Sequence, residues 1–170
     1  MCIIIDTNVI STVIDKTTQN HANFKELHEW IFRGKGKIIY GGTKYLKEVS
    51  KYAVLFTELR KIGKAVYISN GLVDNQEAVV SEQINHPNFD DQHLIALLKV
   101  SKCKLICSLD ARAYPYFRHA LFFQPASNKP RIYSSSRNKS LLCDKNLCEL
   151  CKPSYATNNK QKEIIDILFQ

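Results

Sequence analysis

Two aspartates stand just after short apolar runs of the type that forms buried strands. Asp6 directly follows residues 2–5, and Asp110 comes three residues after the run 104–107. Because ligand sites in parallel α/β sheets gather at the carboxyl ends of strands, we expect the two carboxylates to lie near each other. Crowded carboxylates repel, and burial adds to the cost. A divalent cation such as Mg²⁺ or Mn²⁺ relieves that repulsion and can activate a water that attacks a phosphodiester.

Two further acidic positions could join this pair. Asp91, with Asp90 beside it, stands at the start of an apolar helix predicted over 91–100, and Glu48 lies in a helix predicted over 43–62. Each acid has an ordinary explanation when taken alone, since aspartate commonly caps a helix and a helical glutamate usually faces solvent. The combination with Asp6 and Asp110 favours a shared site.

The elements that would position these acids alternate along the chain. Apolar, β-branched runs predict strands over 2–5, 37–40, 65–68 and 104–107, with an edge strand over 131–133. Periodic apolar residues predict helices over 23–32, 43–62, 73–84 and 91–100, and residues 6–8 offer N-cap chemistry for a further helix through 9–14. Alternating strands and helices predict an α/β fold, a three-layer α/β/α sandwich around a parallel sheet of four to five strands.

The positive charge is concentrated in the last third of the chain. The formal net charge is +8, and residues 111–160 hold nine Lys or Arg against two acids. Basic surfaces attract nucleic acids, so this region, with Lys44 and Lys47, is the predicted backbone-binding surface. The residues predicted to contact substrate are Arg112, Arg118, Arg131, Arg137 and Lys139.

Six cysteines raise the question of their redox state. The chain opens without a basic leader and no apolar run reaches the length of a membrane span, so we expect a cytoplasmic protein with reduced thiols. Cys103 and Cys107 flank a predicted strand and should be core residues. Two interpretations remain open for the others near the C-terminus: unligated thiols, or part of a Zn²⁺ site completed by another side chain such as His119. The candidate zinc ligands are Cys143, Cys148 and Cys151.

Four segments together resemble the motifs of PIN-domain nucleases. The opening IIIDTNVIS resembles the first motif, YLKEVSK the second acidic position, and FDDQHLIALLKVSKCKLICSLD the third and fourth together. The order and spacing match over about residues 1–135. The resemblance therefore implies a PIN-like nuclease domain over 1–135, followed by a basic, cysteine-containing extension over 136–170.

The resemblance implies a metal-dependent endoribonuclease that hydrolyses RNA with Mg²⁺ or Mn²⁺. It implies that the catalytic acids are Asp6, Glu48, Asp91 and Asp110, that the metal ligands are Asp6, Asp91 and Asp110, and that the supporting residues are Asn8, Asp90 and Ser108. Thr7 would cap the following helix. The sequence departs from the family pattern at Arg112, close behind the last acid, which favours one metal ion over two.

The resemblance leaves partners and alternatives open. Small relatives of this kind often serve as toxins of toxin–antitoxin pairs, which implies an inhibitory protein partner beside the RNA; a homodimer is also compatible with the sequence. One alternative is a structure-directed DNA nuclease that uses the same acids. Another is a non-catalytic nucleic-acid-binding protein, in which the acids are helix caps and the terminal cysteines form a zinc knuckle.

Overall fold

Five parallel strands form one sheet at the centre of the molecule. The computed structural model describes residues 1–84, 86 and 89–169. The strands are β1 (Cys2–Ile5), β2 (Lys37–Gly41), β3 (Ala65–Ile68), β4 (Leu105–Cys107) and β5 (Arg131–Tyr133), in the order β3-β2-β1-β4-β5. β1 lies in the middle and pairs with β2 and β4. Its four residues are fully buried, as expected for a parallel strand covered on both faces.

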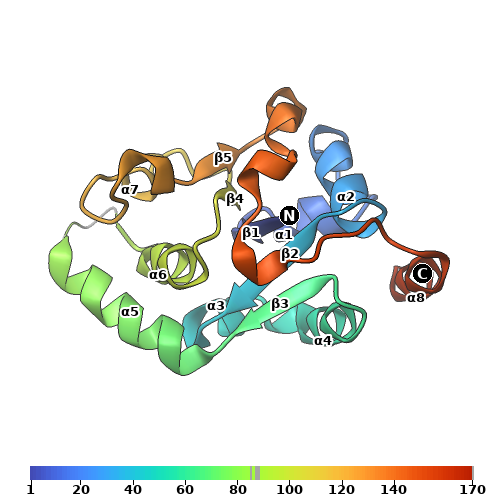
Figure 1. The fold of residues 1–170 in the computed structure, drawn as a ribbon, viewed down its shortest axis with the longest axis horizontal. Coiled ribbons are helices and arrows are strands. Elements are labelled where there is room, and N and C mark those ends of the chain that lie inside the picture. The colour runs from blue at the N-terminus through green and yellow to red at the C-terminus, as the bar shows by residue number, and fades with distance from the viewer. Residues whose placement is uncertain (85, 87–88, 170) are drawn as a thin grey trace.

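Helices cover both faces of the sheet. Figure 1 shows α5, α6 and α7 on one side and α2, α4 and α8 on the other. The helices are α1 (Ile10–Ile14), α2 (Lys25–Phe32), α3 (Thr43–Glu48), α4 (Ala53–Lys61), α5 (Asn70–Gln83), α6 (Gln92–Ser101), α7 (Tyr114–Phe117) and α8 (Asn159–Leu168). The prediction of a three-layer α/β/α sandwich with a parallel sheet is confirmed.

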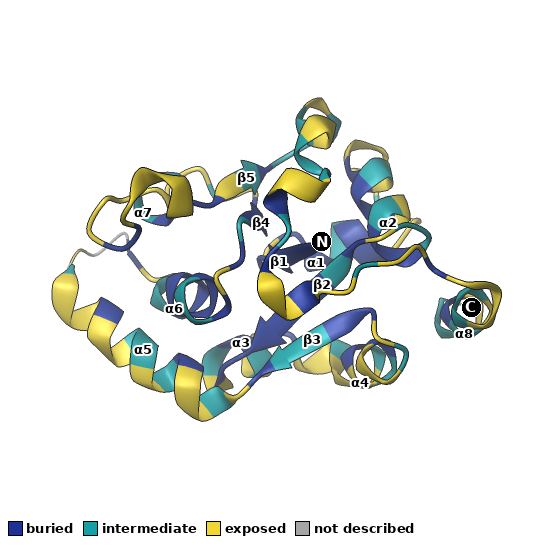
Figure 2. Ribbon diagram, in the orientation of Figure 1, coloured by how far each residue is buried: buried dark blue, intermediate teal, exposed yellow. Residues whose placement is uncertain are grey.

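The core lies between the sheet and its covering helices. Figure 2 shows buried residues along the strands and on the inner faces of the helices, while the outer face of α5 is largely exposed. Large side chains such as Phe24, Phe32, Tyr45 and Phe56 are almost completely buried around the isoleucines of the central strands. This core fixes the strand ends from which the candidate site is built.

Two predictions of local structure were wrong. The single helix expected over 43–62 is divided into α3 and α4 by a 3₁₀ turn, η2 (Ser50–Tyr52). The helix after Asp6 begins at Ile10, its N-cap position is Val9, and no side chain caps it, so Thr7 is not the cap. The helix predicted over 91–100 is α6, which begins at Gln92.

The segment after β5 consists mainly of short turns. They are η4 (Ser136–Leu141), η5 (Asp144–Asn146) and η6 (Glu149–Cys151), while η1 (His21–Phe24) and η3 (Ala126–Asn128) lie earlier in the chain. Hydrogen bonds tie this segment to the amino ends of the strands: the Met1 ammonium donates to Ser154 Oγ at 2.7 Å, and Lys37 Nζ donates to the Pro153 carbonyl at 3.1 Å. Residues 153 and 154 therefore lie at the end of the sheet opposite to Asp6 and Asp110, whereas η4 contacts β5 and α2.

The last helix is anchored at its start. Asn158 and Gln161 form a reciprocal capping box at the beginning of α8, and Gln161 Nε2 also donates to the Ile62 carbonyl at 2.7 Å. Asp166 pairs with Arg33 of the segment that follows α2. Within the described part of the chain, no helix combines the length and apolar character needed to span a bilayer.

Candidate functional site

Asp6 is the buried centre of the acidic site. The carboxyl end of β1 delivers it directly, and only 3% of the residue is exposed. Ser108 Oγ donates to Asp6 Oδ2 at 2.6 Å, and Asn8 Nδ2 donates to the same oxygen at 3.0 Å. Burial raises the pKa of Asp6, while the bonds from Ser108 and Asn8 oppose that rise. Ser108 and Asn8 therefore hold a buried carboxylate in place, as expected for supporting residues.

Asp110 stands beside Asp6 at the end of the neighbouring strand. Ser108 Oγ, which binds Asp6, also accepts from the Asp110 backbone N–H at 3.1 Å, so one hydroxyl links the two acids. Arg112 grips the Asp110 carboxylate through Nε at 3.0 Å and an Nη atom at 2.8 Å. This bidentate contact with Arg112 lowers the pKa of Asp110. Asp110 is thus an ionised acid that forms an ion pair with the Arg112 guanidinium.

Asp91 faces the same two acids from the start of α6. It occupies the N-cap position, yet its side chain makes no capping hydrogen bond, so helix capping does not account for it. Burial, followed by the charges of Asp6, Asp90 and Asp110, raises the pKa of Asp91 to about 7. A buried aspartate whose charge is disfavoured by neighbouring acids is a candidate functional residue.

Glu48 lies apart from this trio, at the rim. It ends α3, is largely exposed, and contacts His93 of α6, with 3.3 Å between Glu48 Oε2 and His93 Nε2. His93 is 2% exposed, and burial lowers its pKa to about 3, so the imidazole is neutral at physiological pH. The contact therefore joins a carboxylate to a neutral ring. Glu48 still acts electrostatically on Asp6, whose pKa it raises slightly.

Lys44 brings a positive charge to the same edge. Its Nζ donates to the Asp90 carbonyl at 2.6 Å, and its charge opposes the rise in the pKa of Asp91. Asp90 itself is exposed. Lys44 therefore bridges α3 and the segment that leads into α6.

Asp6, Asp91 and Asp110 are close enough to affect one another's charge, but their oxygens do not form a compact set of metal ligands. Within the described ranges, the one group of three or more His, Cys, Asp or Glu side chains with ligand atoms all within 4.8 Å of one another is Cys2, Cys148 and Cys151. Asp6, Asp91 and Asp110 thus face one another across a wider gap.

The predicted substrate-binding residues divide into three groups. Arg112 lies in the acidic site; Arg118 and Arg131 line a groove beside the edge strand β5, together with Lys129 and Tyr114. Tyr114 connects this groove to the site, because its hydroxyl donates to the Ser108 carbonyl at 2.8 Å. The third group lies on η4 and comprises the exposed Arg137 and Lys139.

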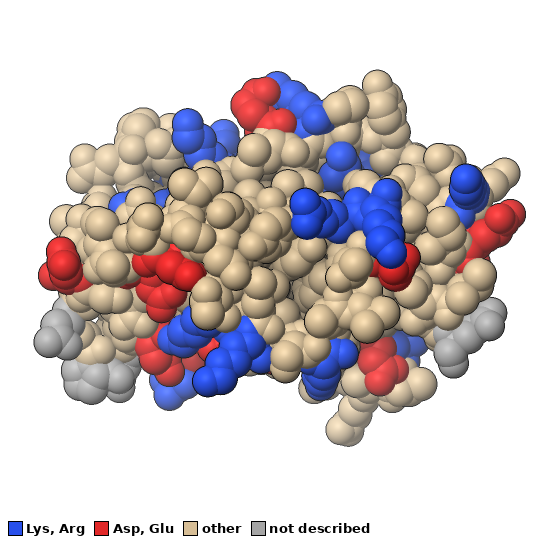
Figure 3. All heavy atoms as spheres, turned by 90° about the horizontal axis from the view of Figure 1, so that it is seen from below, with Lys and Arg blue, Asp and Glu red and all other residues tan. Residues whose placement is uncertain are grey.

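Acidic and basic side chains are mixed on the face of the molecule that Figure 3 shows from below. Figure 3 shows acidic side chains gathered on the half of this face where α5 lies, with lysine and arginine side chains directly beside them. The net charge of +8 is therefore not spread as a uniform basic coat. The groove beside β5 is one of two concave surfaces of the described residues that basic side chains line; the other is lined by Lys99, Lys102 and Lys104.

The cysteines differ from the prediction in two respects. Cys2 and Cys151 are joined as a disulfide, which contradicts the expectation that all thiols are reduced. Cys2, rather than Cys143, completes the cluster with Cys148 and Cys151. The prediction that Cys103 and Cys107 are core residues is confirmed, since both are buried.

Sequence reasoning did not pair Glu48 with His93 or Lys44 with Asp90, and it missed Lys129 as a member of the groove. The helical phase of α6 signals that His93 faces inward, but no local pattern reveals its partner.

The chain matches no family model, no curated protein and no solved structure.

Proposed function

We propose that the protein is a metal-dependent endoribonuclease whose active site is the cluster of Asp6, Asp91 and Asp110. The observation that carries the proposal is the state of Asp91, whose pKa rises to about 7 because it is buried beside three other carboxyl groups. A divalent cation would remove this repulsion. The resemblance to PIN-domain nucleases supports the same assignment independently.

The donor set fits a hard cation. Asp6, Asp91 and Asp110 offer carboxylate oxygens, the ligands that Mg²⁺ and Mn²⁺ prefer, and they are the residues that would hold the ion. Bound there, the cation would activate a water molecule and stabilise negative charge on the scissile phosphate. Ser108 and Asn8 keep the Asp6 carboxylate oriented toward the site.

The surrounding cations fit a phosphodiester substrate. Arg112 presents a guanidinium next to Asp110, and a guanidinium binds phosphate through two parallel hydrogen bonds. The groove with Arg118, Lys129 and Arg131 would bind phosphates further along the strand. Tyr114, in the same groove, offers a ring on which an unpaired base can stack. These features favour a single-stranded substrate.

The decisive experiment compares cleavage of labelled single-stranded RNA, single-stranded DNA and flapped DNA with Mn²⁺ and with EDTA. We expect Mn²⁺-dependent cleavage of RNA. Asp6→Asn and Asp91→Asn should each reduce the rate by about 100-fold or more, since a metal site contributes several kcal/mol to transition-state stabilisation. Asp144→Asn, an exposed acid of η5 at the other end of the sheet, is the matched control and should cleave like the wild type.

The other outcomes separate the alternatives. Cleavage of flapped DNA without cleavage of RNA would favour a structure-directed DNA nuclease on the same acids. Retained RNA binding by both the wild type and Asp6→Asn, with no cleavage by either, would favour a non-catalytic binding protein. Circular dichroism of each variant shows whether a lost activity reflects a lost fold.

A further inference from the structure

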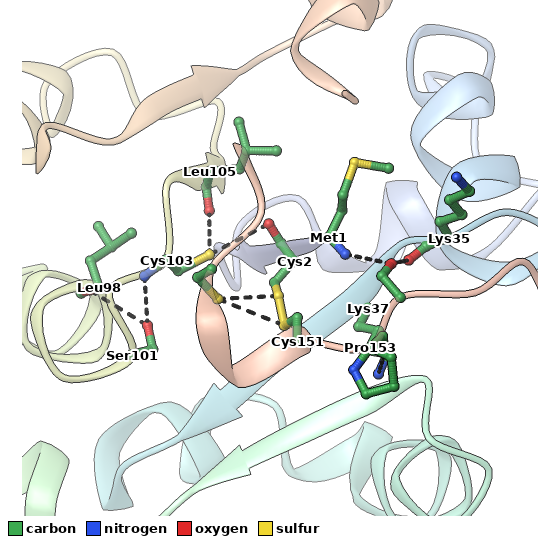
Figure 4. The surroundings of a disulfide bond; sticks show 12 residues. Met1, Cys2, Lys35, Lys37, Leu98, Ser101, Cys103, Leu105, Cys151 and Pro153 are labelled. Atoms are coloured by element: carbon green, nitrogen blue, oxygen red, sulfur yellow. Dashed lines mark hydrogen bonds between the residues drawn. A yellow bond between two sulfur atoms is a disulfide. The ribbon is translucent and has the colours of Figure 1, made fainter. Parts of the chain in front are cut away.

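Four buried cysteines meet at the amino ends of the strands, at the end of the molecule opposite the acidic site. Cys2 opens β1, Cys103 precedes β4, Cys148 directly precedes η6 and Cys151 is the last residue of η6. Figure 4 shows Cys2, Cys103 and Cys151 gathered around this point. The cluster joins parts of the chain that are separated by as many as 149 residues.

Two of the sulfur–sulfur separations are close to those of a tetrahedral ligand set, while Cys2 and Cys151 are bonded to each other. Cys2 Sγ and Cys148 Sγ are 3.3 Å apart, and Cys148 Sγ and Cys151 Sγ are 3.8 Å apart. A zinc–sulfur bond of about 2.3 Å places tetrahedral sulfur ligands about 3.8 Å from one another. Cys103 lies beside Cys148, since their thiols are hydrogen-bonded and both residues line one cavity. The Cys103 sulfur lies outside the group of three whose ligand atoms are all within 4.8 Å of one another, so Cys103 is the neighbouring thiol that would move in as the fourth ligand.

The backbone around Cys148 is arranged as in a thiolate-binding turn. The backbone N–H groups of Leu150 and Cys151 donate toward the Cys148 sulfur. Thiolates rather than thiols bind metals, and N–H donors to the sulfur stabilise the thiolate.

The C-terminal segment buries too few apolar side chains to hold its position without a further link to the rest of the protein. From Ser134 to Phe169 its buried apolar side chains are Cys148, Cys151 and Ile165, which is too few for an independent core. Short segments of this kind are commonly held by disulfides or by a structural metal. Two of the three residues are the cysteines of the cluster.

We propose that Cys2, Cys103, Cys148 and Cys151 form a structural zinc site that fastens the C-terminal segment to the amino ends of β1 and β4. The Cys2–Cys151 disulfide is then the oxidised, metal-free form. A dithiol reductant supplies two electrons and two protons to give two thiols, and is itself oxidised to a disulfide. Zinc binding by the four sulfurs then releases their protons to solvent.

The site is distinct from the proposed nuclease centre in position and chemistry. Four sulfur ligands select zinc or iron over Mg²⁺ and Mn²⁺, and a closed set of four leaves no open position for a water. Lys37 and Lys64 carry positive charge close to Met1, which precedes Cys2, and offset part of the two negative charges of zinc bound by four thiolates.

The test measures metal content of the full-length protein, purified with a reductant and zinc, then dialysed. We expect one zinc per chain in the wild type and in Cys143→Ser, the matched control, because Cys143 belongs to the same segment but not to the cluster. Cys148→Ser and Cys103→Ser should each lose the metal. Cobalt substitution should give the absorption of tetrahedral cobalt bound by thiolates, and X-ray absorption at the zinc edge should show four sulfurs.

The wild type alone keeps the proposal testable if a variant fails to fold. A reduced wild-type protein that holds no zinc and whose melting temperature does not change with zinc would overturn the proposal. Stoichiometric iron in place of zinc would overturn it too. Full zinc in Cys103→Ser would show that the four-cysteine shell is wrong, as would equal loss in Cys143→Ser and Cys148→Ser.

Discussion

Replacing Asp91 by Asn should stabilise the metal-free protein at alkaline pH. In the folded protein the pKa of Asp91 rises from 3.8 to about 7, because of burial and the charges of Asp6, Asp90 and Asp110. A group whose folded pKa is raised binds its proton more tightly in the folded than in the unfolded state. Its contribution is fully favourable below pH 4 and is lost as pH rises to about 7.

The magnitude follows from that pKa. At about 1.4 kcal/mol per pH unit, a change from 3.8 to about 7 corresponds to about 4 kcal/mol at pH 8. Asp91 is only partly buried, so solvent screens part of this repulsion and we expect about 2 kcal/mol. Asparagine carries no charge and removes that cost at every pH.

The assay is urea unfolding of the wild type and Asp91→Asn in EDTA, from pH 4 to pH 8. The variant should be more stable by about 2 kcal/mol at pH 8, and the difference should shrink toward zero near pH 4. Mn²⁺ at 100 times its dissociation constant should stabilise the wild type by about 2.7 kcal/mol and the variant much less. A difference that does not vary with pH, or a variant less stable than the wild type at pH 8, would refute the reasoning.

Three further predictions concern single hydrogen bonds. Ser108→Ala removes the 2.6 Å bond to Asp6 Oδ2, so urea unfolding at pH 7 should show a loss of about 1–3 kcal/mol, and the acid limb of the RNA-cleavage pH profile should move to higher pH. Tyr45→Phe leaves the Ile5 carbonyl without its 2.8 Å donor in the core and should cost about 1–3 kcal/mol by the same measurement. Asn158→Ala breaks the capping box of α8 and should cost about 1 kcal/mol, with faster amide exchange in α8 and no change in β1.

The strands could be read from the sequence because their signal is local. β1, β3 and β5 begin and end where the apolar runs predict, since each run is short, rich in β-branched residues or flanked by turn formers. The break between α3 and α4 could not be read in this way. Tyr45, Val49, Tyr52, Phe56 and Leu59 continue a helical spacing across the 3₁₀ turn, so the apolar pattern hides the change of direction.

The sequence predicts the positions of those site residues that directly follow a strand. Asp6 and Asp110 follow adjacent parallel strands, so their proximity follows from the topology. The grip of Arg112 on Asp110 and the contact between Glu48 and His93 depend on side-chain directions that no local pattern encodes. Cys2 and Cys148 are 146 residues apart, so their meeting required the folded chain.

The central strand β1 has a consequence for genetic dissection of this protein. It is four residues long, its first residue carries the Cys2 sulfur, and its last leads into Asp6. At about 3.3 Å per residue, these two positions are only about 13 Å apart along one rigid rod. A substitution within β1 would therefore disturb the acidic site and the cysteine cluster together, whereas substitutions at Asp91 and Cys148, which lie outside β1, affect one of them at a time.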